Sequence, residues 1–396
     1  MQRLRTVWRR KGHRSLGLMA LVAILGAAPT ALGAGEQLVL EYTFERPQFT
    51  QVKIDGIEYE RIVMPGCPNA GDIGSPALPA RGARILIPFG MEVAKIEARG
   101  EKISLGNGHL IEPVAPPARL QSAPASWLAP TPNSAIYASP AALPASVFEE
   151  VGTFGFRGYR ILILKLNPVE YVPATGELSY YPNLSVIVEA ERGGSTSPLF
   201  RGLALDEQEV RTRVDNPAKI KTYPTGGARN DRSYDLLIIT TSALAGGFQP
   251  LKDYHDSHGL PTEIHTTADI GSNDPDDVRA YITDCYTNDE ISYVIIGGDD
   301  DVIPAKDLYV QAWPGGDVET AMPGDIYFGC LDGTWNYDGD SRWGEPTDGP
   351  GGGDVDLVAE VYIGRACGSN ATAATSTIRA NCGPSLSLTA IISLAL

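Results

Sequence analysis

The sequence has few cysteines and few basic residues for its length. Its 396 residues include five cysteines, and no two of these have the short spacing of a zinc ribbon or a disulfide framework. Lys and Arg number 32 against 48 Asp and Glu, which gives a formal net charge of −16. Such an acidic chain is repelled by nucleic acid and by anionic membrane surfaces, so neither is an expected partner.

The chain also lacks an apolar run near its start that is long enough for a membrane-spanning helix, which needs about 20 residues. The apolar run of residues 16–28 is shorter, follows six basic residues and precedes the small residues Ala31, Gly33 and Ala34. This pattern predicts a secretory signal peptide over residues 1–33, with cleavage after Gly33 or Ala34. We therefore expect a secreted protein whose formal charge, without those six basic residues, is −22.

Residues 36–190 consist of short apolar runs separated by Pro and Gly, which is typical of an all-β sandwich. We expect strands at Gln37–Phe44, Gln51–Ile54, Arg84–Pro88, Val93–Ala98, Tyr159–Leu166 and Leu184–Glu189. Residues 113–144 are dominated by Pro, Ala and Ser and are expected to form an extended loop that bridges the two halves of the sandwich.

Residues 191–232 read as a linker, because Gly, Ser, Pro and charged residues predominate there. A basic, exposed linker in a secreted chain is a candidate for proteolytic processing. The arginines considered for this cut are Arg211, Arg213, Arg229 and Arg232.

Residues 233–366 alternate strand and helix patterns, which predicts a doubly wound α/β layer with parallel strands. The expected order is strand Tyr234–Thr240, helix Phe248–His258, strand Leu260–Thr266, helix Asp274–Thr287 and strand Ser292–Gly297. Further strands are expected at Ile326–Cys330 and Ala359–Ile363. The run from Tyr293 to Ile296 ends at Gly297-Gly298 and three aspartates, Asp299–Asp301, at the carboxyl end of a strand, where α/β sheets place ligands and catalytic groups.

Several motifs resemble the gingipain-type cysteine peptidases, in the order that this family requires. In the first half, Gly74–Pro79 followed by Ile85–Gly90 resembles the family's propeptide pattern, and Asn167–Leu178 resembles the end of that propeptide. In the second half, the resemblance continues through Tyr293–Ala305, Gly324–Gly329 and Glu360–Arg365 and covers residues 36–368 in all.

The resemblance implies a multidomain secreted zymogen: a β-sandwich propeptide (36–190) that packs on a caspase-like α/β peptidase, represented here by its N-terminal part (233–366). It implies protein or peptide substrates, a Cys–His dyad and a structural role for Asp299 at a subdomain seam. In the family the dyad lies beyond the strand that corresponds to Glu360–Arg365. Residues 367–396 carry a single charge and match nothing in the family, so we expect an aberrant tail from a truncation or frameshift, a dyad beyond the end of the chain, and a chain that is inactive as given.

A dyad within the present chain would need one of the thiols Cys285, Cys330 or Cys367 and one of the imidazoles His255, His258 or His265. We expect His255 and His258 to lie on a solvent-facing helix surface, and Cys285 and Cys330 to fill the core. Cys330 with His265 is the least unfavourable pair, and no catalytic residue is assigned.

An acidic, glycine-rich loop carries oxygen ligands at short spacing, as calcium sites do. The residues considered for calcium are Asp332, Asn336, Asp338, Asp340 and Glu345, and further aspartates follow at 348, 354 and 356. The loop lacks the twelve-residue EF-hand pattern, and a solvated acidic loop is the alternative.

Two functions therefore remain open from the sequence. The first is the precursor of a gingipain-type cysteine endopeptidase. The alternative is a non-catalytic, calcium-stabilised extracellular binding or surface protein. A metallohydrolase is disfavoured, because the acidic loop has no accompanying His-carboxylate motif.

Overall fold

The computed structural model divides the chain into two units, residues 1–34 and residues 35–396. It describes residues 35–116, 130–226, 234–311, 318–349 and 354–368. The predicted signal peptide, most of the predicted tail, Arg229, Arg232 and Cys382 lie outside these described residues.

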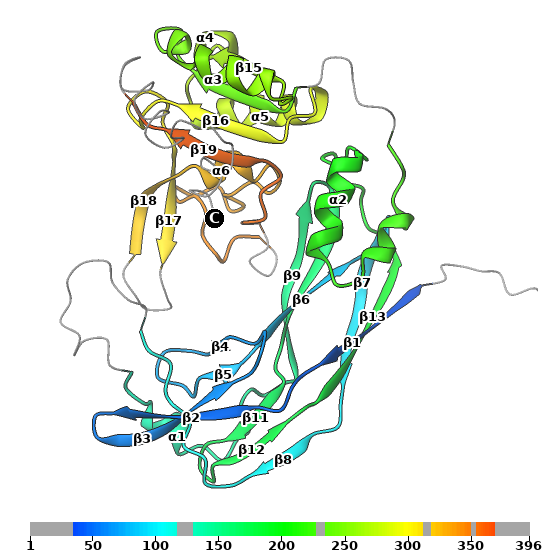
Figure 1. Ribbon diagram of the computed structural model, residues 1–396, viewed down its shortest axis with the longest axis vertical. Helices are drawn as coiled ribbons and strands as arrows, with labels where there is room; N and C mark the ends of the chain where they lie inside the picture. The colour runs from blue at the N-terminus through cyan, green and yellow to red at the C-terminus, as the bar shows by residue number, and fades with distance from the viewer. Residues whose placement is uncertain (1–34, 117–129, 227–233, 312–317, 350–353, 369–396) are drawn as a thin grey trace, which may run out of the picture. The chain divides into compact units, whose positions relative to one another are not determined.

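The first half of the second unit is rich in strands (Figure 1). Its strands are β1 (Glu36–Thr43), β2 (Gln48–Ile54), β3 (Ile57–Val63), β4 (Asn69–Ala70), β5 (Leu78–Pro79), β6 (Arg81–Leu86), β7 (Met91–Arg99), β8 (Ile103–Gly106), β9 (Phe148–Phe156), β10 (Tyr159–Leu166), β11 (Val169–Val172), β12 (Glu177–Tyr180) and β13 (Asn183–Arg192). The short helix α1 (Ser134–Tyr137) lies within the segment expected to be an extended loop.

All ladders between these strands are antiparallel. The sheets have the orders β1-β13-β7, β6-β10-β9 and β11-β12-β8, and two strand pairs, β2–β3 and β4–β5, accompany them. Alternate residues of β10 and β13 point into one core, which contains Leu162, Leu164, Val186 and Val188. Because side chains alternate between the faces of a strand, this period-two burial follows from the sequence pattern. The antiparallel, strand-rich character expected for this half is confirmed.

The described part of the predicted linker is folded. It forms α2 (Ala204–Arg213) and the 3-10 helix η2 (Pro217–Thr222). Val210, Val214, Ile220 and Tyr223 are buried in one cluster with residues of β6, β9 and β10. Their burial stabilises the segment on the strand-rich half, although the sequence contains few apolar residues here.

The second half is a parallel α/β layer. Its elements are β14 (Leu236–Thr240), α3 (Ala245–Ser257), β15 (Thr262–Thr266), α4 (Thr267–Ile270), α5 (Pro275–Asn288), β16 (Tyr293–Gly297), β17 (Lys306–Gln311), β18 (Val318–Gly324), α6 (Ile326–Gly329) and β19 (Tyr362–Ala366). The sheet order is β15-β14-β16-β19, and all three ladders are parallel.

Helices cover both faces of this sheet. Leu236 and Ile238 of β14 pack with Phe248 of α3, whereas Leu237 and Ile239 pack with α5. Two covered faces explain why β14 and β16 are continuous apolar runs without alternation. The doubly wound arrangement predicted for residues 233–366 is confirmed at this level.

One predicted strand is wrong. Ile326–Gly329 form the helical turn α6, and the N–H of Cys330, which follows it, donates to the Ile326 carbonyl at 3.0 Å. A run of five apolar residues does not distinguish a strand from a buried helical turn. Arg279 of α5 holds this turn in place, since its guanidinium lies over the Tyr327 ring and donates to the Cys330 carbonyl. Among the described residues no helix is both long and apolar enough to cross a membrane.

Candidate functional site

The carboxyl ends of β16 and β19 meet at one edge of the parallel sheet, where the sequence predicted a functional position. Arg365 of β19 ties this edge together: its guanidinium donates to the Asp325 carboxylate at 2.6 and 2.8 Å and to the carbonyls of Gly298 and Ile303 at 3.0 and 2.7 Å. Gly298 has φ 149°, and its N–H donates to the Ala366 carbonyl. The edge is therefore a rigid framework of hydrogen bonds.

The three aspartates at this edge have unequal surroundings. The Asp299 carbonyl accepts from the N–H groups of Val302 and Ile303, and the Asp300 carboxylate accepts from the Ala305 N–H at 2.7 Å. Asp299 is half-buried, whereas Asp300 and Asp301 are exposed. Asp299 and Asp300 thus fix the turn after β16, and the seam role of Asp299 stays a prediction.

None of the described cysteines is an activated nucleophile. Burial raises the pKa of the thiols of Cys67, Cys285 and Cys330, that of Cys285 to about 11. The thiol of Cys367 is exposed, and its pKa is also raised, by desolvation and then by the Asp299 carboxylate. Since the thiolate is the attacking species, a raised pKa makes each a poor nucleophile at neutral pH.

The histidines do not supply a general base to these thiols. His265 Nδ1 is 2.9 Å from the Tyr281 hydroxyl, and its ring contacts Tyr234. His258 is exposed, as expected, but His255 is 3% exposed and packs with the core side of α3. The expectation that His255 faces solvent is wrong: it follows Phe248 and Leu251 at helical spacing and therefore shares their buried face.

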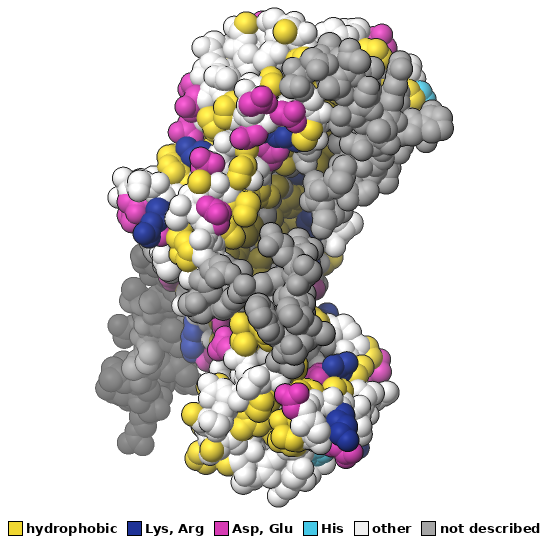
Figure 2. All heavy atoms as spheres, turned by 90° about the vertical axis from the view of Figure 1, so that its left-hand side faces the viewer, with side chains coloured by type: hydrophobic (Ala, Val, Ile, Leu, Met, Phe, Trp, Pro, Cys, Tyr) yellow, Lys and Arg dark blue, Asp and Glu magenta, His cyan; other side chains and the backbone are white. Residues whose placement is uncertain are grey.

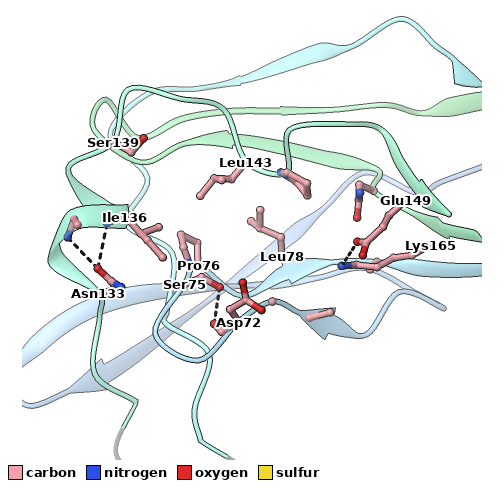
Figure 3. Close-up of a pocket in the computed structure, with 16 residues that line it drawn as sticks. Asp72, Ser75, Pro76, Leu78, Asn133, Ile136, Ser139, Leu143, Glu149 and Lys165 are labelled. Atoms are coloured by element: carbon pink, nitrogen blue, oxygen red, sulfur yellow. Dashed lines mark hydrogen bonds and ion pairs between the residues drawn. The ribbon is translucent and has the colours of Figure 1, made fainter. Parts of the chain in front are cut away.

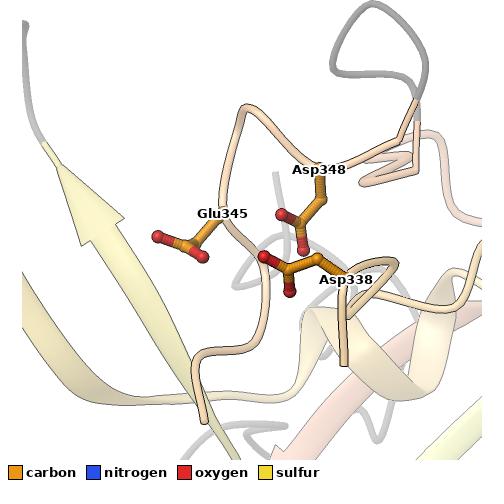
Figure 4. A group of neighbouring side chains, drawn as sticks. All are labelled: Asp338, Glu345 and Asp348. Carbon is orange, nitrogen blue, oxygen red and sulfur yellow. The ribbon is translucent and has the colours of Figure 1, made fainter. Parts of the chain in front are cut away.

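The acidic loop brings three carboxylates together (Figure 4). One oxygen each of Asp338, Glu345 and Asp348 lie within 4.8 Å of one another, and the carboxylates of Asp338 and Asp348 point toward each other. Asp348 is 5% exposed and its Oδ2 has no hydrogen-bond partner. Desolvation, followed by the carboxylates of Asp338 and Glu345, raises the pKa of Asp348.

The remaining predicted calcium ligands fall into different places. The Asn336 amide donates to the Asp340 carbonyl, and its Oδ1 is buried without a partner. Asp340 is exposed and its carboxylate accepts from the Arg342 N–H at 2.6 Å. Asp332 does not join Asp338 and Glu345; it lies instead beside Asp356 and Glu360. The structure thus adds Asp348 to Asp338 and Glu345.

A second buried polar cluster joins three parts of the chain. Asp206 of α2 is fully buried, and its Oδ1 accepts from Arg157 at 2.8 Å and from Arg201 at 2.6 Å. Arg157 follows β9, and its Nε donates to the Glu360 carbonyl at 3.1 Å. Arg201 donates to the Ile291 carbonyl at 2.7 Å and lies 3.8 Å from the Tyr286 ring centre. No motif in the sequence predicted this cluster.

Two surface features carry no assigned chemistry. A cavity of about 640 Å³ lies in the strand-rich half (Figure 3), where Leu78, Ile136 and Leu143 point into it and the Glu149–Lys165 ion pair stands at its border. It includes part of the Gly74–Pro79 motif but no cysteine or histidine. On the face in Figure 2, acidic side chains are scattered among basic and apolar ones.

Two family models match successive parts of the chain. Residues 27–205 match the model of the C25 propeptide, and residues 229–380 match that of peptidase family C25. Curated relatives include Lys-gingipain and Lys-gingipain 381 of Porphyromonas gingivalis, each 22% identical over 313 residues, or 76% of this chain. The chain spans 17% of the length of these relatives.

Two solved structures are also similar in part. One is a complex of the pro- and mature domains of RgpB from Porphyromonas gingivalis, at 16% identity and a TM-score of 0.39, covering 46% of this chain and 93% of that one. The other concerns the zymogenic latency of gingipain K from the same organism, at 25% identity and a TM-score of 0.32, covering 42% of this chain and 96% of that one.

Proposed function

The chain belongs to the gingipain-type precursors of peptidase family C25, and on that premise we propose that it is the secreted zymogen form of a cysteine endopeptidase. The supporting observation is the order of the two matches: a propeptide region at residues 27–205 precedes a peptidase region at 229–380. The strand-rich half would be the propeptide, and the α/β half would be part of a caspase-like peptidase. Its substrates would be proteins or peptides.

The chemistry of such a peptidase needs a thiolate, an imidazole that moves the proton to the leaving amine, and N–H groups that hold the oxyanion. The described cysteines have raised thiol pKa values, and His265 is engaged by Tyr281. We therefore propose that residues other than the described ones supply the dyad. The described α/β half contributes the framework on which such a site is built.

Packing of the propeptide on the peptidase part is supported by contacts across the two halves. Arg157 reaches the Glu360 carbonyl, and Arg213 of α2 donates to the Tyr362 hydroxyl at 2.8 Å. Hydrogen bonds from charged donors are stronger than neutral ones, and the one from Arg157 is buried.

Activity of the natural precursor provides the test. The precursor isolated from its own culture medium should hydrolyse a peptide library after its connector is cut, and iodoacetamide should abolish that hydrolysis. The recombinant 396-residue chain should hydrolyse none, because its described thiols are not activated. Hydrolysis that survives iodoacetamide but stops with a chelator would contradict the cysteine mechanism, and an inert precursor would favour the non-catalytic alternative.

Processing is expected in residues 227–233 before it occurs on α2. A peptidase binds an extended substrate, whereas Arg211 and Arg213 lie in the last turn of α2 and pair with Glu207 and Glu209. Limited trypsin digestion followed by mass spectrometry should give a first cut after Arg229 or Arg232. Replacing both of these by Gln should remove that cut, whereas R211Q with R213Q should leave it. A first cut within residues 234–300 would contradict the boundary.

Calcium binding to the acidic loop is the second part of the proposal. The ligands would be Asp338, Glu345 and Asp348, with the amide oxygen of Asn336 next to them in the loop. Hard oxygen ligands on a loop bent at Gly339 and Gly344, which have φ 72° and 83°, suit Ca²⁺. The unpartnered Oδ2 of Asp348 supports this, since a buried carboxylate oxygen without a partner is otherwise costly.

A further inference from the structure

The turn between β9 and β10 covers a group of carboxyls of the α/β half. Arg157 and Gly158 form a two-residue turn in which both have positive φ, 51° and 77°, the conformation of a type I′ hairpin. The Gly155 N–H before it donates to Asp356 Oδ2 at 3.1 Å, and Arg157 donates to the Glu360 carbonyl. The strand-rich half therefore contacts this cluster of carboxyls directly.

The contact at Gly155 leaves no room for a side chain. A Cβ added at Gly155 would lie 2.2 Å from Asp332 Oδ2, far inside van der Waals contact. The turn thus packs closely against Asp332 and Asp356. The absence of a side chain at this position is what permits the close approach.

Three carboxyls lie together beneath the turn. Glu360 is fully buried and Asp356 is 4% exposed. Asp332 Oδ1 and Glu360 Oε1 are buried without a hydrogen-bond partner. Carboxylates that repel one another out of water hold protons instead of ionising.

Neighbouring charges do not neutralise the group. Arg279, Tyr286 and Cys330 face it, and Arg157, which pairs with Asp206, donates to the Glu360 carbonyl. Arg279 donates to the carbonyls of Cys330, Asp332 and Gly333, and Arg157 is shared with Asp206, so neither guanidinium is hydrogen-bonded to Asp356 or Glu360 side chains.

We propose that the β9–β10 turn docks on the α/β half and covers a cluster of three carboxyls, Asp332, Asp356 and Glu360, that hold protons. Release of the turn then requires proton loss and is favoured as pH rises. Its biological role rests on the proposed zymogen function, because the turn would then attach the propeptide to the peptidase part in a pH-dependent way. Asp356 and Glu360 are the titrating groups.

The direction of this pH dependence follows from the direction of the pKa shifts of the carboxyls. Burial, and then the Asp332 carboxyl, raises the pKa of Asp356 to about 7 and that of Glu360 to about 9. When the turn lifts and water enters, these values fall toward the ordinary carboxyl range near 4. The closed state therefore holds more protons between about pH 4 and 9, and its advantage is present at the lower pH and lost as pH rises through 7 to 9.

Hydrogen exchange on the full chain tests this proposal without any activity assay. Protection of the amides of residues 154–158, corrected for intrinsic exchange rates, should fall about tenfold or more from pH 6 to pH 9, since each proton lost changes the equilibrium by up to about tenfold per pH unit. D356N with E360Q, which mimics the protonated groups, should show less than about a twofold change over that range.

Controls separate this effect from general loosening. E150Q removes an exposed carboxyl on the same strand and should keep the wild-type pH profile, whereas G155A should lower protection at every pH. If the double variant does not fold, D356N alone should reduce the slope. A wild-type profile independent of pH, or an unchanged slope in the neutralised variants, would overturn the proposal, whether or not the precursor proves to be a peptidase.

Discussion

The variant D206N is expected to lose about 3–5 kcal/mol of unfolding free energy, the usual cost of removing one partner of a buried ion pair. Asp206 is the carboxylate between Arg157 and Arg201, and all three side chains are at least 96% buried. An amide in its place leaves two buried guanidinium groups without the negative charge that balances them. Urea denaturation followed by tryptophan fluorescence measures the loss.

The neighbouring residue provides a matched control. Glu207 lies on the same helix and forms an exposed ion pair with Arg211 at 2.6 Å, and exposed pairs contribute about 0–1 kcal/mol. E207Q should therefore be nearly neutral. Equal stability of D206N and E207Q would show that the Asp206 cluster contributes nothing to holding the fold.

Calcium is expected to raise the melting temperature of the full chain by several degrees, and D348N should abolish that rise. A ligand at 100 times its Kd stabilises the folded state by about 2.7 kcal/mol. Asp348 is the most buried of the three carboxylates, so its loss removes a ligand oxygen that water does not replace. Scanning calorimetry with CaCl₂ and with chelator measures the effect.

Two comparisons make the calcium experiment specific. D340N changes an exposed carboxylate of the same loop that accepts a backbone N–H, and it should keep the calcium response. Without calcium, D348N should be as stable as the wild type or more stable, because it relieves repulsion with Asp338 and Glu345. A melting curve that calcium and chelator leave unchanged would refute the site.

The α/β layer could be predicted because its central strands are unbroken apolar runs and α5 has a clear start signal. Asp274 caps α5 and Pro275 begins it, an arrangement typical of helix starts,. The six strands predicted in the first half exist, with bounds shifted by a few residues. The other strands of this half were not predicted, because their apolar content is low or their runs are short: β3, β4, β5, β8, β9, β11 and β12.

The buried position of His255 could have been predicted from the sequence. Its spacing from Phe248 and Leu251 places all three on one helix face, although the residues next to His255 in the sequence are polar. The helical turn at Ile326–Gly329 had no such signal, since its geometry depends on Arg279, which is distant in sequence.

The acidic loop shows why ligand sets are hard to predict from spacing. Short spacing suggested Asp332 and Asp340, yet the structure groups Asp338 and Glu345 with Asp348. The path of the loop is fixed by the buried Trp335 and by turns at glycines with positive φ. Which oxygens meet is decided by that path, and sequence distance does not encode it.

The bonds that Arg157 and Arg201 make to the α/β half end on main-chain oxygens, those of Glu360, Ile291 and Tyr286. A carbonyl is present whatever amino acid occupies its position. Substitution at these three positions therefore changes a buried side chain but keeps the acceptor of each hydrogen bond, whereas loss of either arginine removes the donor. We expect the substitutions that break these contacts between the two halves to lie in the strand-rich half and its connector.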